Sequence, residues 1–176
     1  MSRQSQSQET KTLVGVSACL LGQKVRYDGH DKKNSFIVDV LSQACDFLPV
    51  CPEAGAGLGI PRPPVQLVGH SEKPRALGKQ DKSLDVTDRL ELFALEQGKI
   101  LNKISGFIFK SRSPSCGLID TPIYDPDNFE EFQTGSGIFA RIFRQYYPDL
   151  PVCDENMLTD SAFVEVFFRQ LKAAHE

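Results

Sequence analysis

The sequence predicts an α/β fold, with a single domain whose mainly parallel sheet is flanked by helices in a Rossmann-like arrangement. Three observations support this prediction. Short apolar runs alternate along the chain with segments of helical periodicity, which is typical of parallel sheets with crossover helices. The chain has 176 residues, of which 40% are hydrophobic, and a chain of this kind can bury its own core. No linker and no true repeat divides residues 13–176, so we expect them to form one domain.

The segment before this domain differs in composition. Residues 1–12 are rich in Ser and Gln and lack the apolar segment of a secretory signal peptide, so we expect a disordered tail. No window approaches the roughly 18 consecutive apolar residues of a membrane-spanning helix. Five cysteines without an export signal are typical of a reducing compartment. We therefore expect a cytoplasmic protein that makes no membrane contact.

The first part of the domain is expected to contain two strands joined by a helix. Residues 13–16 and 47–50 are short apolar runs of the kind that forms buried strands. Between them, the pair Asn34-Ser35 is suited to cap a helix that extends to about residue 44. A stretch rich in Gly and Pro follows at residues 54–64 and is typical of a loop.

The middle of the chain is expected to contain a small hairpin, a long helix and a third buried strand. Residues 65–68 and 75–77 are suited to the hairpin. Residues 85–103 carry most of their apolar side chains at helical spacing, and residues 106–109 are a short apolar run. The acidic segment 120–132, which contains two prolines, is interpreted as a surface loop.

The C-terminal part is expected to add two helices and a fourth strand. Residues 138–147 show the periodicity of an amphipathic helix, and residues 150–152 form another short apolar run. Thr159 or Asp160 is suited to cap a final helix that ends at about residue 174.

Three of the five cysteines follow predicted strands. Cys19, Cys51 and Cys116 each lie a few residues beyond the end of such a strand. Ligands of open parallel sheets bind beside the carboxyl ends of the strands. If the three strands are neighbours, the three thiols therefore meet in one crevice. Spacing alone leaves open that these residues are buried small hydrophobes, because the sequence has no Cys-x-x-Cys pair.

The number of cysteines also bears on the kind of site. A closed structural metal site has four protein ligands, whereas a catalytic site keeps one position open. Three thiolates would leave such a position for a substrate. Cys45 ends a helical pattern and is expected in the core, while Cys153 follows a short strand and is an alternative fourth ligand.

Three sequence blocks in order resemble those of the thiouracil desulfidase family, and the resemblance extends over about residues 13–158. The blocks are residues 16–22 (VSACLLG) with 25–29 (VRYDG), residues 51–53 (CPE) with 57–58 (GL) and 61–62 (PR), and residues 112–117 (RSPSCG). Weaker similarity covers residues 135–137 (GSG) and Glu155. Two positions depart from the family's pattern, because Gln66 stands about where a Glu is expected and Cys153 stands where the family does not require a cysteine.

The resemblance implies a cofactor and a reaction. A 4Fe-4S cluster would be held by Cys19, Cys51 and Cys116, with its fourth iron free to bind the sulfur of a thiocarbonyl substrate. The reaction would remove sulfur from 4-thiouracil or a related thiolated pyrimidine and give uracil and hydrogen sulfide. Glu53 would be the catalytic carboxylate and Ser113 a supporting hydroxyl.

The chemistry of such a reaction agrees with these residue types. Thiocarbonyl sulfur is a soft ligand, which suits iron held by thiolates, and the metal would polarise the C=S bond. Water then attacks the ring carbon, and a carboxylate must take its proton. Glu53 is close enough in sequence to Cys51 for this role. The cleavage is hydrolytic and needs no net electron transfer.

Four further residues within the blocks are expected to bind substrate. They are Ser17, Tyr27, Asp28 and Ser115. Simpler interpretations stay open, because Ser17 could bond only to the backbone and the Asp28-Gly29 pair could form only a turn. Ser113 could likewise serve only to satisfy the turn at Pro114.

Two other functions compete with the desulfidase prediction. A non-catalytic iron-sulfur or sulfur-carrier protein would need a closed cluster, which Cys153 could complete. A metal-free cysteine enzyme would need one reactive thiol with a base nearby, and none of the three histidines is an evident partner. The net charge of −3 favours a small thiolated pyrimidine over tRNA as the substrate, because binding to many phosphates needs a broad basic face.

Overall fold

A computed structural model describes residues 11–174, which form two four-stranded sheets with helices packed on them. Sheet A contains only parallel strands, in the order β2-β1-β5-β8. Its strands are β1 (Thr12–Ser17), β2 (Cys45–Val50), β5 (Phe107–Phe109) and β8 (Val152–Asp154). The α/β class and the parallel sheet are thus confirmed. Most of the expected tail lies outside the described residues, but Thr12 already begins β1.

Sheet B is a mixed sheet in the order β4-β3-β6-β7. Its strands are β3 (Val65–Val68), β4 (Arg75–Gly78), β6 (Thr121–Tyr124) and β7 (Glu131–Gly135). The hairpin of β3 and β4 is confirmed, whereas the prediction of a loop over residues 120–132 is wrong. Asp125, Asp127, Glu130 and Pro126 lie in the turn of a second hairpin formed by β6 and β7. The buried side chains Thr121 and Ile123 alternate in β6 with less buried ones, as in any half-buried strand.

The helices differ from the prediction mainly at their ends. The expected helix over residues 85–103 is divided into α2 (Thr87–Glu96) and α3 (Gly98–Leu101), because Gly98 is a poor residue for a helix interior. The segment after Asn34 forms a π-helical turn, η2 (Phe36–Val40), and a 3₁₀ turn, η3 (Leu41–Gln43). The expected loop over residues 54–64 starts too early, because residues 54 and 55 belong to a short helix, α1 (Pro52–Gly55).

The C-terminal helices are confirmed. Helix α4 (Ile138–Tyr146) is amphipathic, and α5 (Ser161–Ala173) ends the described chain. Asp160 caps α5, since its side chain accepts hydrogen bonds from the backbone of Ala162 and Phe163. Thr159 instead ends the 3₁₀ turn η4 (Met157–Thr159). None of the helices in the described residues is long and apolar enough to span a membrane.

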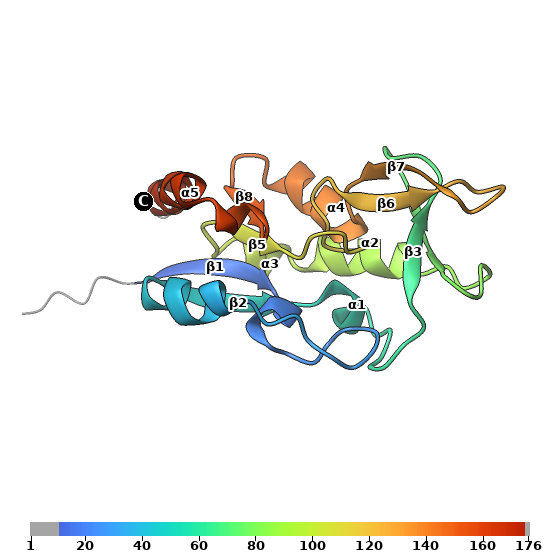
Figure 1. The fold of residues 1–176 in the computed structure, drawn as a ribbon, viewed down its shortest axis with the longest axis horizontal. Coiled ribbons are helices and arrows are strands. Elements are labelled where there is room, and N and C mark those ends of the chain that lie inside the picture. The colour runs from blue at the N-terminus through green and yellow to red at the C-terminus, as the bar shows by residue number, and fades with distance from the viewer. Residues whose placement is uncertain (1–10, 175–176) are drawn as a thin grey trace, which may run out of the picture.

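The two faces of sheet A are buried by different elements. Val14, Val16 and Ile108 pack with Phe167 and Leu171 of α5. The opposite face packs on α2 and α4, which lie between the two sheets in Figure 1. Residues of sheet B join this second cluster, so the two sheets share one hydrophobic core.

Rings from sheet A and α4 form the centre of the shared core. The ring centroids of Phe107 and Phe109 are 4.2 Å apart, and Phe143 lies 5.2 Å from Phe107. Leu67 and Ile123 contribute to the same cluster from sheet B. The geometry between the sheets, where the candidate site lies, is therefore fixed by close packing.

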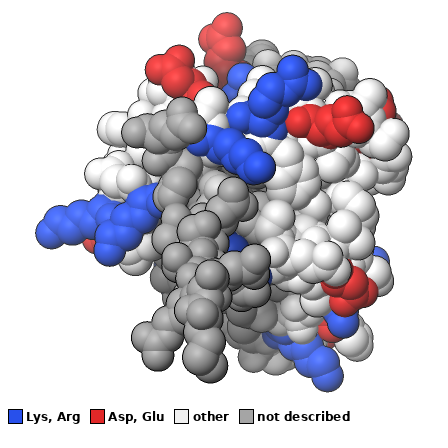
Figure 2. All heavy atoms as spheres, turned by 90° about the vertical axis from the view of Figure 1, so that its left-hand side faces the viewer, with Lys and Arg blue, Asp and Glu red and all other residues white. Residues whose placement is uncertain are grey.

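The end of the molecule that carries α5 has a mixed surface charge. Figure 2 shows basic and acidic side chains interspersed on the described part of this face. A continuous basic face, which binding to a long RNA requires, is not present on the described residues that this view shows.

Candidate functional site

The carboxyl ends of β1, β2 and β5 open into a cavity of about 340 Å³. Cys19, in the 3₁₀ turn η1 (Ala18–Leu21), Cys51 and Cys116 all line this cavity. Val50 of β2 and Val65 of β3 line it too, so the cavity lies between the two sheets. The expectation that the three thiols meet in one crevice is confirmed. The reason is the strand order, which makes β2, β1 and β5 neighbours.

The environment of the three thiols opposes their ionisation when no metal is bound. Burial, together with the neighbouring Cys51, raises the pKa of Cys19 to about 11. Burial also raises the pKa of Cys51 and of Cys116. Thiolates at these positions therefore need a positive group beside them, which bound metal provides.

Two hydrogen bonds tie the thiols to the protein. The Cys51 thiol donates to the carbonyl oxygen of Val25 over 3.7 Å. The side chain of Ser17 is hydrogen-bonded to Cys116, and the Ser17 hydroxyl oxygen accepts a bond of 2.9 Å from the backbone N–H of Lys110. Ser17 therefore connects the ends of β1 and β5, and its hydroxyl is placed to donate to the sulfur of Cys116, an interaction of the kind that tunes a bound cluster. The bond from Cys51 needs the thiol proton and is lost when this sulfur binds metal as a thiolate.

The donor set fits an iron-sulfur cluster. Three thiols of one cavity are the ligand type that holds such clusters. Within residues 11–174, no group of His, Cys, Asp and Glu side chains is arranged around a single metal ion. A cubane has a different requirement, because each thiolate binds a different iron atom.

Cys45 and Cys153 lie elsewhere. Both belong to the core cluster between sheet A and α5, and Cys153 is fully buried there. Neither lines the cavity. The structure therefore does not support Cys153 as a fourth ligand, while Cys45 occupies the core as expected.

Glu53 is a buried carboxylate in the cavity wall. It lies in the first turn of α1, two residues after Cys51. Its Oε1 accepts a hydrogen bond of 2.9 Å from the Ser115 hydroxyl, and its Oε2 pairs with Nε of Arg62 at 2.8 Å. Arg62 is held in turn by the carbonyl oxygens of Val25 and Gly59. The carboxylate is therefore fixed in orientation at the cavity.

Ser113 lines the cavity and also organises the loop of Cys116. Its hydroxyl oxygen accepts hydrogen bonds from the backbone N–H groups of Ser115 (3.3 Å) and Cys116 (3.0 Å). These bonds satisfy backbone groups of the turn at Pro114, which is the simpler role that the sequence left open for Ser113. The two bonds use the oxygen as acceptor, so the hydroxyl hydrogen of Ser113 remains available to a ligand.

The candidate substrate-binding residues separate into two groups. Ser17, Tyr27 and Ser115 line the cavity together with Glu53. Asp28 is outside the lining and accepts a hydrogen bond from the backbone of His30. A contact between Asp28 and substrate stays a prediction without support from this geometry.

Glycines allow the Cys116 loop to pack against α4. Gly137 begins this contact, because its N–H donates to Gly117, and a Cβ on Gly137 would lie 2.5 Å from the carbonyl carbon of Ser115. Backbone N–H groups at the start of α4 donate to the carbonyl oxygens of Pro114 and Ser115. This close approach gives a physical reason for Gly137 in the block at residues 135–137.

One polar cluster beside the cavity was not predicted. Glu155 pairs with Lys110 and accepts bonds of 2.8 and 2.7 Å from the backbone N–H and the hydroxyl of Ser111. A signal existed, since residues 48–53 (LPVCPE) and 150–155 (LPVCDE) are similar. The two segments lie at the two edge strands of sheet A, so each glutamate follows an edge strand at the same end of the sheet.

Comparisons with known proteins agree with this site. A family model described as 2-thiouracil desulfurase matches residues 14–155. "Uncharacterized protein YbbK" of Bacillus subtilis (strain 168) is 30% identical over 156 residues, which cover 84% of this chain and 99% of that protein. The structure of the 4Fe-4S-dependent thiouracil desulfidase TudS is similar with a TM-score of 0.65 and 34% identity, covering 89% of this chain and 99% of that one. The chain therefore belongs to the 2-thiouracil desulfurase family.

Proposed function

We propose that the protein is a 4Fe-4S-dependent desulfidase that converts 4-thiouracil or a related thiolated pyrimidine to the oxygen compound and hydrogen sulfide. One observation carries the proposal: three cysteines and a fixed carboxylate line the same cavity at the carboxyl ends of adjacent parallel strands. Membership in the 2-thiouracil desulfurase family and the likeness to TudS support it.

The three cysteines would hold the cofactor. A 4Fe-4S cluster on Cys19, Cys51 and Cys116 would supply an iron atom without a protein ligand, which is a soft Lewis acid for a thiocarbonyl sulfur. Ser17 would stabilise the ligand set through its bond to Cys116.

Glu53 would handle the protons of the reaction. Its position lets it orient a water molecule and take one proton as the water attacks the ring carbon. Ser115 and Arg62 keep the carboxylate in place. Ser113 would donate its free hydroxyl hydrogen to the pyrimidine, while Tyr27 would contact the ring from the cavity mouth. The overall change replaces C=S by C=O, consumes one water and releases H₂S without electron transfer.

The competing functions receive less support. A closed cluster in a carrier protein needs a fourth protein ligand, and Cys153 is packed in the core. A cavity of about 340 Å³ has the size of a small-molecule site, which favours a thiolated pyrimidine over tRNA. All five cysteines are free. This agrees with a cytoplasmic location, because disulfides are rare in that reducing compartment.

The test is anaerobic reconstitution followed by a desulfidase assay. We expect about four iron atoms per chain, loss of the thiocarbonyl absorption of 4-thiouracil, and one sulfide released per uracil formed. In ¹⁸O-labelled water, the label should appear at the carbonyl carbon, and no reductant should be needed. Iron incorporation with no sulfide release from the free base, the nucleoside or the nucleotide would contradict the proposal. A requirement for stoichiometric reductant would contradict its hydrolytic mechanism.

A further inference from the structure

A second groove adjoins the cavity on the side of sheet B. It has a volume of about 110 Å³ and includes Gln66, Thr121 and Tyr124 in its lining. Four residues line both the groove and the cavity: Val65, Lys79, Arg112 and Pro114. The groove and the cavity therefore lie side by side, with these four residues at their common boundary.

Two cationic side chains stand at the junction of these two spaces. Lys79 and Arg112 line both, and neither forms an ion pair with any part of residues 11–174. Of the other cations in the cavity wall, Arg26, Arg62 and Lys110 pair with carboxylates, whereas the exposed Lys32 forms no ion pair within the described residues. Lys79 and Arg112 are both exposed, and they differ from Lys32 in lining the groove as well as the cavity. An arginine together with a lysine is a common way to hold a phosphate.

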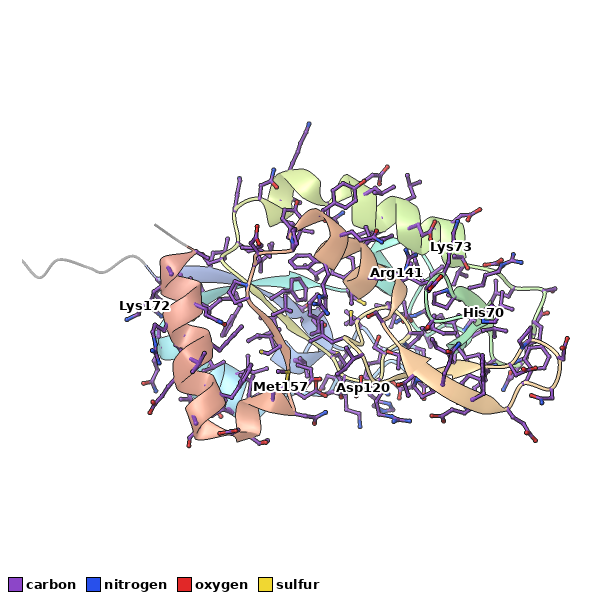
Figure 3. The ribbon with its side chains drawn as sticks, turned by 90° about the horizontal axis from the view of Figure 1, so that it is seen from above. His70, Lys73, Asp120, Arg141, Met157 and Lys172 are labelled. Atoms are coloured by element: carbon purple, nitrogen blue, oxygen red, sulfur yellow. The ribbon has the colours of Figure 1, made fainter. Side chains whose placement is uncertain are left out.

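The backbone of Arg112 is held in an unusual conformation. Its φ is 58°, in the left-handed region, and its N–H donates to Oδ1 of Asp120 over 2.9 Å. In Figure 3, Asp120 lies between the end of the molecule with Lys172 on α5 and the end with His70 beside β3. Non-glycine residues in this region cost free energy and cluster at ligand sites. Asp120 therefore fixes the point from which the Arg112 side chain leaves the loop.

The groove itself offers an amide and an aromatic ring. Leu67 of β3 pairs with Ile123 of β6, and both point into the core, so the neighbouring Gln66 and Tyr124 lie on the opposite face of sheet B. Gln66 is only 8% exposed, and its side chain lines the groove. An amide and a half-buried tyrosine in one groove are suited to a nucleobase, which is recognised by hydrogen bonds to its edge and by stacking.

We infer that this groove is a second subsite, which takes a nucleoside joined through a phosphate to the thiolated nucleoside in the cavity. Lys79 and Arg112 hold the bridging phosphate, while Tyr124 and Gln66 contact the second base. The inference rests on the proposed function and extends its substrates to short thiolated oligonucleotides, of which the dinucleotide is the smallest. The groove has room for roughly four waters at liquid density, which matches a single base ring.

The test compares unmodified nucleotides, so it does not depend on desulfidation. Binding of UpU and of UMP to the reconstituted protein is measured by calorimetry at one low salt concentration. We expect UpU to bind about tenfold more tightly than UMP, the size of one stacking contact. Tyr124→Ala should bring the affinity for UpU down to that for UMP. Gln66→Glu should reduce the same ratio, because a carboxylate cannot donate the hydrogen bonds that the amide offers to the second base.

A matched variant and three outcomes make the test decisive. Tyr146→Ala, at a tyrosine of α4 that is 65% exposed, should keep the tenfold ratio. Equal affinities for UpU and UMP in the unaltered protein, or a ratio that survives Tyr124→Ala, would overturn the subsite. Tighter binding of intact tRNA than of UpU at the same salt would overturn the limit to short oligonucleotides. If no thiolated compound releases sulfide while the ratio holds, the proposed function fails and the groove stands as a nucleotide site.

Discussion

The five cysteines of this chain lie in two environments, the hydrophobic core and the cavity. Cys45 and Cys153 belong to strands, and their side chains join the core on the α5 side of sheet A. Cys19, Cys51 and Cys116 come after strand ends and line the cavity. Position along the strand, not the local sequence around sulfur, therefore separates core thiols from candidate ligands.

Replacement of any cavity cysteine should remove the cluster. We expect Cys19→Ala, Cys51→Ala and Cys116→Ala to retain less iron after anaerobic reconstitution and to lose activity, because a cubane held by two thiolates leaves two irons exposed. Cys153→Ala is the control and should keep its iron. It should nevertheless lower the free energy of unfolding, because removal of the buried sulfur atom leaves a small cavity in the core. Loss of iron in Cys153→Ala, with the fold intact by circular dichroism, would instead make that residue a ligand.

Glu53→Gln should separate cofactor binding from turnover. The amide keeps the shape of the side chain but cannot take a proton from water, so we expect full iron content and a kcat lower by about 10²–10⁴-fold. The buried Arg62 loses its ion pair, so the melting temperature should fall as well. Glu96→Gln, on the exposed side of α2, is the control. Full activity in Glu53→Gln would remove the carboxylate from the mechanism.

Glu155 should contribute to stability in a pH-dependent way. Burial opposes ionisation of this carboxyl, but the bonds from Lys110 and Ser111 outweigh burial and lower its pKa below the usual 4.5. A lowered pKa in the folded state stabilises the protein above about pH 4.5, and this contribution is lost as the pH falls further. Urea unfolding between pH 6 and pH 3 should therefore show a weaker pH dependence in Glu155→Gln than in the unaltered protein.

Two details sharpen this pH experiment. Burial raises the pKa of the adjacent Asp154, so the effect of Asp154 on the pH dependence of stability is opposite to that of Glu155. Asp154 is present in both proteins, and the difference between their two pH profiles therefore reports on Glu155. Glu165→Gln, at an exposed position of α5, should leave the pH dependence unchanged. Identical profiles for Glu155→Gln and the unaltered protein would mean that the pairing with Lys110 does not stabilise the fold.

At the scale of elements, the site depends on how the Cys116 loop meets the start of α4. The helix donates backbone hydrogen bonds to the loop, and glycine at the contact lets the two backbones approach. The sequence predicted helix and loop separately, with the glycines only as part of a family resemblance. Their contact was not predictable from local patterns, because it depends on the packing of two segments about 20 residues apart in sequence.

Gly137→Ala should disturb this contact. The added Cβ would lie 2.5 Å from the Ser115 carbonyl carbon, so either α4 or the loop must move. We expect the free energy of unfolding to fall by about 1–3 kcal/mol and iron retention to decrease, as measured by urea unfolding and by release of iron to a chelator. The control is Gly98→Ala in α3, where the Cβ would meet only the Tyr147 hydroxyl at 3.7 Å. Unchanged stability and iron retention in Gly137→Ala would show that the loop does not depend on this approach.

At the scale of the whole molecule, the two sheets share one core although they form separate hydrogen-bonded units. Phe107 and Phe109 of sheet A, Phe139 and Phe143 of α4, and Ile123 of sheet B belong to one cluster. Neither sheet can lose its partners without exposing this apolar surface. The cavity between the sheets therefore keeps its shape only while the shared core is intact.

The shared core predicts a single unfolding transition for the domain. Thermal unfolding followed by circular dichroism and by thiol accessibility should give one midpoint. Phe139→Ala should lower the stability by about 3–5 kcal/mol and shift both probes together, whereas Phe132→Ala, at a half-exposed position of β7, should change little. Two separate transitions would mean that sheet A and sheet B unfold as independent units, contrary to one domain over residues 13–176.

The sequence by itself determined the strands of sheet A, the amphipathic helices and the position of three cysteines after strand ends, because each depends on patterns within a few residues. It did not determine the β6-β7 hairpin of sheet B, since the acidic turn concealed the alternation in β6, nor the role of Glu155, whose partners lie about 45 residues away. It also left Cys153 undecided, because strand periodicity does not say which face of a sheet meets solvent, helix or ligand. Only the tertiary structure decided these points, since pairing of distant strands sets which side chains share a cavity.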